Sequence, residues 1–183
     1  MDVRFQHHDA ASANEALDGV IVPLYQASHQ DLLSDPFFSA ERFAERVRGY
    51  LRAPGFGLVV ASIDGEPVGQ AFGYALPPDA RWWQGLTTPV PEGFTDETGT
   101  RTFALNELMV VPDWQGKGIA HATHNELLSS RSEQRATLLV SEDNEPAQAA
   151  YARWGWRKIG KLQPFPDSPH FDAMIISLPL SNA

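Results

Sequence analysis

The fold of this chain is decided by the stretch Val110-Val111-Pro112-Asp113-Trp114-Gln115-Gly116-Lys117-Gly118-Ile119-Ala120. It predicts a strand that ends before the proline, a turn with two glycines, and the start of a helix. The first N–H groups of a helix have no partner inside it, and the helix dipole adds partial positive charge there. Because glycine lets a ligand approach the backbone closely, the stretch predicts an anion site for a phosphate or pyrophosphate.

Two common phosphate-binding motifs are excluded by single residues. A Walker loop carries Ser or Thr after its Gly-Lys pair, whereas Gly118 follows Lys117 here. A dinucleotide-binding fingerprint needs a small residue at the position of His121. The pattern that fits is Gln-x-x-Gly-x-Ala after a strand ending in Val-x-Pro, with Gln115, Gly118 and Ala120 at its fixed positions.

A second block follows in the chain. The apolar run 136–140 predicts a buried strand, and the polar residues 141–145 followed by Pro146 predict the start of a helix. That helix is expected to stop at a glycine. The spaced residues of the block are Asn144, Ala147, Tyr151, Gly155 and Trp156.

The two blocks together resemble the GCN5-related N-acetyltransferase (GNAT) superfamily, from about Phe56 to the C-terminus. The resemblance implies a mixed α+β (α/β) fold, with a central mixed sheet of about six to seven strands flanked by helices. It also implies transfer of an acetyl group from acetyl-CoA to a primary amine of a small molecule or peptide, by direct attack in a ternary complex. Two alternatives stay open: a non-catalytic acyl-CoA-binding sensor, and an acyltransferase that uses another acyl-CoA donor.

The resemblance also implies which residues bind acetyl-CoA. Asn144 would hold the pantetheine arm or cap its helix, and both roles can coexist. Backbone groups of the strand would bind the pantetheine amides, and N–H groups of the loop would bind the pyrophosphate. These residues are Leu108, Met109 and Val110 in the strand, and Gln115, Gly116, Lys117, Gly118, Ile119, Ala120 and His121 in the loop.

Acyl transfer to an amine needs a group that removes a proton. An alkylammonium with a pKa of ~10.4 costs roughly 4–5 kcal/mol to deprotonate at neutral pH. Glu107 is the candidate base and substrate-ammonium ligand, because a glutamate is unusual in a strand that is otherwise apolar. The alternative is an outward-facing or ion-paired glutamate.

Tyr151 is the candidate general acid, which would protonate the leaving CoA thiolate and contact the cofactor. A phenol with a pKa of ~10 can donate to a thiolate of pKa ~8.5 only where the pocket favours it. The alternative is a tyrosine that packs on its helix.

The segment 77–102 predicts a long inserted loop, rich in Pro, Gly, Thr and acidic residues. Trp82 and Trp83 in this loop are candidate substrate-binding residues that wall the acceptor pocket. Alternatively, they anchor the loop to the body of the protein, or lie in a homodimer interface.

Composition limits the remaining possibilities. We expect a single domain over residues 1–183, without disulfides or thiolate metal sites, since the chain has no cysteine. A net charge of -9 argues against nucleic acid as a partner. No apolar run resembles a signal peptide or a membrane span, so a cytoplasmic protein is expected. His121 and His124 share a helix face without a third ligand, which predicts a solvated face and no metal.

Periodicity predicts the order of the elements. Helices are expected near 13–28, with a kink at Pro23, and after an N-cap at Ser39. The remaining expected elements are a hairpin of strands 57–63 and 67–76, strands 103–111 and 136–140 with a helix between them, and a closing pair at 156–162 and 171–178.

Overall fold

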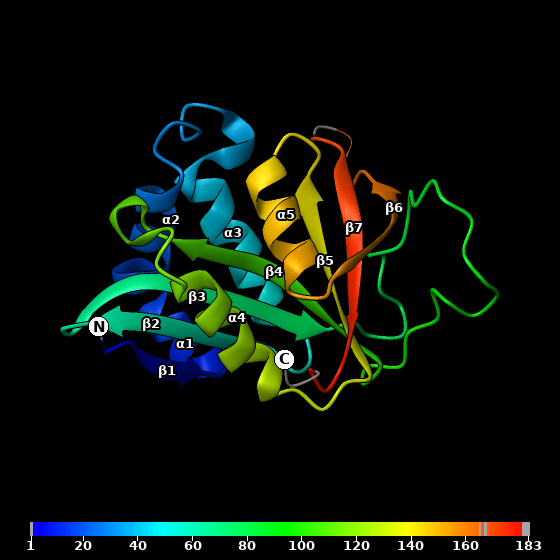
Figure 1. Cartoon of the computed structure of the whole chain (residues 1–183), viewed down its shortest axis with the longest axis horizontal. Coiled ribbons are helices and arrows are strands. Elements are labelled where there is room, and N and C mark those ends of the chain that lie inside the picture. Colours follow the sequence, from blue (N-terminus) through cyan, green and yellow to red (C-terminus); the bar gives the residue numbers. More distant parts are fainter. Residues whose placement is uncertain (1, 165, 167, 181–183) are drawn as a thin grey trace. The chain divides into compact units, whose positions relative to one another are not determined.

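The computed structural model describes residues 2–164, 166 and 168–180. The chain divides into two compact units, one formed by residues 1–74 and 105–130 and the other by residues 75–104 and 131–183. The described residues carry seven strands with helices, so the predicted mixed α+β fold is confirmed (Figure 1). One domain over 1–183 stays a prediction.

The first unit is a sheet covered by helices, with its strands in the order β1-β2-β3-β4. β1 and β2 are antiparallel, as are β2 and β3. Its elements are β1 (Arg4–His8), α1 (Ala10–Ala16), the π-helical turn η1 (Leu17–Ile21), α2 (Val22–Ser28), the 3₁₀ turn η2 (Pro36–Phe38), α3 (Ala40–Tyr50), β2 (Gly57–Ile63), most of β3 (Glu66–Ala75) and of β4 (Thr102–Val110), the 3₁₀ turn η3 (Pro112–Trp114) and α4 (Ile119–Ser129).

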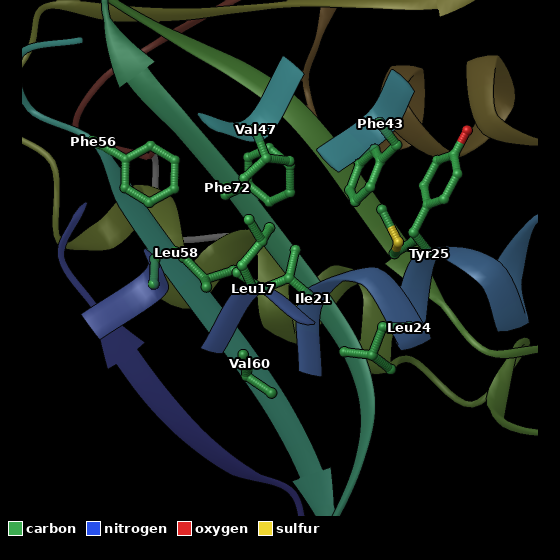
Figure 2. Packing of buried hydrophobic residues seen from close by; sticks show 12 residues of the cluster. Leu17, Ile21, Leu24, Tyr25, Phe43, Val47, Phe56, Leu58, Val60 and Phe72 are labelled. Carbon is green, nitrogen blue, oxygen red and sulfur yellow. The ribbon is translucent and has the colours of Figure 1, made fainter. Parts of the chain in front are cut away.

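β2 buries side chains on both faces, because consecutive side chains of a strand point to opposite faces and nearly all of those in β2 are apolar. Leu58 and Val60 of β2 pack among residues of η1, α2 and α3, as Figure 2 shows. Ala61 and Ile63 of the same strand pack in a second cluster with Ile119 of α4. Both faces of β2 therefore belong to the core, which fixes the register of the strands that carry the site.

The first long helix contains an irregular turn just before Pro23. In η1 the Val22 N–H donates to the Leu17 carbonyl, five residues earlier. Proline has no N–H to continue the ordinary helical ladder. The predicted disturbance at Pro23 is thus a widened turn between α1 and α2.

One strand was missed by the sequence reasoning. β1 lies at the edge of the first unit's sheet and pairs with β2, with Phe5 opposite Ala61. Its residues are mostly polar and partly exposed, so the apolar alternation that identifies a strand is weak there. The other six strands lie within one residue of their predicted bounds.

The second unit contains β5 (Arg135–Ser141), α5 (Glu145–Arg153), β6 (Arg157–Leu162) and β7 (Phe171–Ser177). Its strand order is β5-β7-β6, with both pairs antiparallel. Residues 76–101 form no helix or strand, and this loop extends beside β6 as the long green trace in Figure 1. The Thr87 N–H donates to the Lys161 carbonyl at 3.1 Å, so the loop contacts β6.

No helix in the described part of the chain is long and apolar enough to cross a membrane.

Candidate functional site

The loop between β4 and α4 presents its backbone to solvent. Gly116 and Gly118 have φ values of 71° and 81°, in the left-handed region that side chains rarely adopt. Gly118 is the N-cap of α4, which therefore has no capping side chain, and the first turn of the helix carries no acidic residue. The Ala122 N–H bonds to the Gly118 carbonyl at 3.0 Å. The N–H groups at the start of a helix, before its first such bond, are the ones to which an anion can bind.

The side chains of this loop fold back to support it. Gln115 donates from Nε2 to the Val110 carbonyl at 2.9 Å. Lys117 donates from Nζ to the Asp113 carbonyl at 2.8 Å and lies 4.4 Å from the centre of the Trp114 ring. The sequence motif thus contains supporting residues as well as binding ones, and the supporting role of Trp114 was not foreseen.

The strand that leads into this loop is tightly packed against β3. Met109 and Val110 are buried, each 6 % exposed, whereas Leu108 is half-buried. A Cβ on Gly69 would lie 2.9 Å from the Met109 carbonyl oxygen. β3 therefore needs glycine at that position, because a larger residue would push the end of β4 away from it.

Glu107, earlier on β4, carries a carboxyl with an altered acidity. It is half-buried, with no hydrogen bond or ion pair to any described residue. Burial raises the pKa of Glu107 to about 7, and the charge of Arg46 acts in the opposite direction. The group keeps some exposed surface although protein surrounds it closely. A carboxyl in this state can accept a proton at neutral pH.

Aromatic side chains surround this carboxyl. Tyr25 stacks on Phe43 with ring centres 3.8 Å apart and donates its hydroxyl hydrogen to the Phe38 carbonyl. Burial, and then the charge of Glu107, raises the pKa of Tyr25 and of Tyr50. These phenols are therefore neutral at physiological pH, and the predicted alternative of an ion-paired Glu107 is not what the described residues show.

In the second unit, Asn144 is the N-cap of α5. Its Oδ1 accepts a hydrogen bond from the Ala147 N–H at 3.1 Å, which is the capping role that the sequence suggested. Tyr151 is half-buried on the same helix, and its ring meets the edges of Trp154 and Trp156 at centre distances of 5.5 and 6.0 Å. The packed alternative for Tyr151 is thus present, and it does not conflict with a hydroxyl that reacts.

The two tryptophans of the 77–102 loop differ sharply. Trp83 is buried and donates from Nε1 to Glu97 Oε1 at 2.9 Å. Arg135 of β5 forms a 3.0 Å ion pair with the same oxygen and lies 5.5 Å from the Trp83 ring centre. Trp82 is half-buried, and its Nε1 has no hydrogen-bond partner among the described residues. Trp83 therefore anchors the loop, and Trp82 retains exposed surface.

The prediction of a solvated His121–His124 face is wrong for the second histidine. His124 is 1 % exposed, and its Nδ1 lies 2.8 Å from Asn125 Oδ1. Burial is the main reason that its pKa falls to about 4, so this histidine is a neutral core residue at physiological pH. Within the described residues, no cluster of three His, Cys, Asp or Glu could hold a metal ion.

The sequence model of the acetyltransferase (GNAT) family matches residues 21–156. The chain belongs to the GNAT family. No curated protein matches it closely enough to add a more specific relationship.

Solved structures share this GNAT fold at low sequence identity. An acetyltransferase from Thermus thermophilus is 14 % identical, with a TM-score of 0.65 and coverage of 97 % of this chain and 98 % of that one. The PaiA N-acetyltransferase from Thermoplasma acidophilum, solved with coenzyme A, is 11 % identical, with a TM-score of 0.60 and coverages of 97 % and 99 %. The ribosomal-protein-S18-alanine N-acetyltransferase from Escherichia coli is 18 % identical, with a TM-score of 0.59 and coverages of 100 % and 96 %. Such similarities establish the fold alone.

Membership of the GNAT family supports acetyl-CoA-dependent acetyltransferase activity. The glycine loop before α4 fits that cofactor, because its exposed backbone and uncapped helix start suit a pyrophosphate.

Proposed function

We propose that this GNAT protein is an N-acetyltransferase that transfers the acetyl group of acetyl-CoA to a primary amine in a ternary complex. The observation that carries this proposal is Glu107, an accessible carboxyl with a pKa near 7 on the strand that leads into the glycine loop. A module that only binds acyl-CoA has no need for such a group, and charging it inside the protein lowers stability.

The proposed chemistry begins with the acceptor ammonium. Glu107 accepts its proton, directly or through a water molecule, and the neutral nitrogen attacks the thioester carbonyl. The resulting tetrahedral intermediate collapses as the carbon–sulfur bond breaks. Tyr151 gives its proton to the departing CoA thiolate, and the attacking nitrogen loses its second proton, which reprotonates the tyrosinate directly or through water. The products are an amide and free CoA, and Glu107 then releases its proton to solvent.

Different parts of the chain are proposed to bind different parts of acetyl-CoA. We assign the pyrophosphate to the N–H groups of residues 116–121 and the pantetheine amides to the backbone of residues 108–110, with Asn144 as a further contact. The fold-back of Gln115 and Lys117 supports the first assignment, since it leaves the loop backbone open.

For the acceptor we propose contact with Trp82, while Trp83 holds the loop in place. The exposed part of the Trp82 ring and its buried, unpartnered Nε1 support this choice. We place the enzyme in the cytoplasm, and a homodimer is the alternative use of the tryptophan loop.

The test is turnover. A panel of small primary amines and peptide N-termini is offered with acetyl-CoA, and release of the free CoA thiol is followed. Propionyl-CoA and succinyl-CoA, compared at equal concentration, identify the preferred donor. Tyr151→Phe is expected to lower kcat by ~10²–10⁴-fold if the phenol donates the proton. Tight acetyl-CoA binding with no turnover of any amine would favour the sensor function instead.

The cofactor site has a separate test. Gly118→Asp should weaken acetyl-CoA binding at least tenfold in calorimetry, because it puts a negative charge beside the pyrophosphate. A Cβ at Gly118 meets no atom within 4 Å, so only its positive φ opposes substitution. Gly118→Asn is the matched control, since asparagine tolerates that φ and is uncharged. Equal affinity of both variants and the wild type would exclude this loop as the pyrophosphate site.

A further inference from the structure

We propose that Arg46 is a positioning residue for Glu107. Its guanidinium is held at a fixed place on α3 and supplies the positive charge that favours the ionised form of the Glu107 carboxyl. This inference rests on the proposed role of Glu107 as the base. It adds a residue that no motif of the chain identifies, because arginines on a helix surface are ordinary.

Arg46 is fixed from several sides. Its Nη1 donates to the Phe37 carbonyl at 3.0 Å. Its guanidinium carbon lies 5.3 Å from the Phe37 ring centre and 6.0 Å from that of Phe43. It also hydrogen-bonds with the Tyr25 side chain. A guanidinium held by a carbonyl, two rings and a phenol has little freedom to turn toward solvent.

The strand geometry directs Glu107 toward the same region. Met109 of β4 packs in the cluster that contains Tyr25 and Phe43. Side chains two residues apart on a strand lie on the same face, so Glu107 is directed toward α2 and α3 as Met109 is. Among the described residues no ion pair joins Arg46 to Glu107. Arg46 therefore acts at longer range and leaves the carboxylate oxygens available to a substrate.

The other titratable groups facing this region are neutral at physiological pH. On α2 and its C-terminal end, burial raises the pKa of Tyr25 and lowers that of His29. On α3 and β3, burial raises the pKa values of Tyr50 and Tyr74. Arg46 is thus the cation in this set, and it lowers a Glu107 pKa that burial has raised.

The experiment follows the Glu107 carboxyl by NMR in the full chain labelled with ¹³C at glutamate side chains. The resonance is assigned by its loss in Glu107→Gln. In Arg46→Met the titration midpoint of Glu107 should move up by roughly half to one pH unit. In Arg46→Lys, which keeps the positive charge, the Glu107 midpoint should lie close to the wild-type value. Arg46→Gln also removes the charge but retains a donor for the Phe37 carbonyl, and it replaces Arg46→Met in the experiment if that variant does not fold.

Arg42→Met is the matched control. Arg42 lies on the same helix, with its guanidinium carbon 4.8 Å from the same Phe37 ring centre. An unchanged midpoint in both neutral Arg46 variants would overturn the inference, and so would an equal shift in Arg42→Met. The titration uses no acceptor, so an enzyme that fails to turn over any amine leaves this result readable. Once an acceptor is found, the acid limb of kcat/KM should move with the midpoint, whereas a purely structural role would lower the rate at every pH.

Discussion

Two glutamates, one in each unit, lie among packed side chains, but one has several direct hydrogen-bond donors and the other has none among the described residues. Glu97 in the second unit directs Oε1 at three donors: Trp83 Nε1 at 2.9 Å, Thr102 Oγ1 at 2.9 Å and Arg135 Nη2 at 3.0 Å. Glu107 in the first unit has no such partner among the described residues. The positive charge that favours its ionised form is that of the more distant Arg46.

The difference separates a structural carboxylate from a reactive one. Direct donors hold the Glu97 carboxylate in one place and occupy its Oε1. Withholding them leaves Glu107 close to the balance between its two protonation states at neutral pH, which is what a base requires. The arrangement at Glu97 joins the long loop to β5, because Arg135 also donates to the Phe94 carbonyl at 2.7 Å.

The largest expected difference is in rate. Glu107→Gln should lower kcat/KM at pH 7 by ~10²–10⁴-fold for the acceptor found in the screen, because the base is lost. Glu97→Gln is the matched substitution in the other unit and should leave kcat/KM of the folded enzyme within a few-fold. Initial rates of CoA release measure both. Equal losses in the two variants would mean that the contrast between the glutamates is not one of function.

The second contrast is in stability. Arg135→Met leaves Glu97 buried without its ionic partner and should reduce the free energy of unfolding by about 3–5 kcal/mol. Urea unfolding at pH 7 measures it. Arg48→Met is the control, since its 3.8 Å pair with Asp18 is exposed and should contribute less than about 1 kcal/mol. If the two variants lose the same stability, the buried network does not hold the loop.

The third contrast depends on pH. The pKa of Glu107 lies near 7 in the folded chain against an ordinary value of 4.5, so the folded state binds the proton more tightly than the unfolded state. Stability is therefore lost as the pH rises between those two values, up to about 3 kcal/mol in total. Glu107→Gln should be more stable than the wild type at pH 8 and similar to it near pH 4. If the free energies of unfolding of the wild type and Glu107→Gln differ by the same amount at every pH from 4 to 8, the raised pKa is contradicted.

The smallest contrast lies between neighbouring tryptophans. Trp83→Phe removes the donor to Glu97 and should lower the free energy of unfolding by about 1–2 kcal/mol. Trp82→Phe removes no described hydrogen bond, and its effect should stay below about 0.5 kcal/mol. Thermal or urea unfolding of the two variants measures both losses of stability. A larger loss in Trp82→Phe would reverse the assignment of anchor and exposed ring.

Local patterns were enough to predict most elements. The apolar run 57–63 with the Asp64-Gly65 turn after it predicts β2. Ser39 caps α3 by accepting from the Arg42 N–H at 3.3 Å. The glycine loop and the Asn144 cap were predicted for the same reason, since each depends on neighbours in sequence. β1 escaped because an edge strand with polar residues has no such local pattern.

Contacts between distant residues decided the remainder. Nothing in the sequence around Glu97 reveals that Arg135, 38 residues away, meets it, or that His124 is buried. The sequence by itself determined the family, the order of elements and the identity of Glu107 as a base candidate, because motifs and periodicity are local. Only the tertiary structure decided which glutamate receives partners and that Arg46 stands near the other. Acidity and burial are set by neighbours in space.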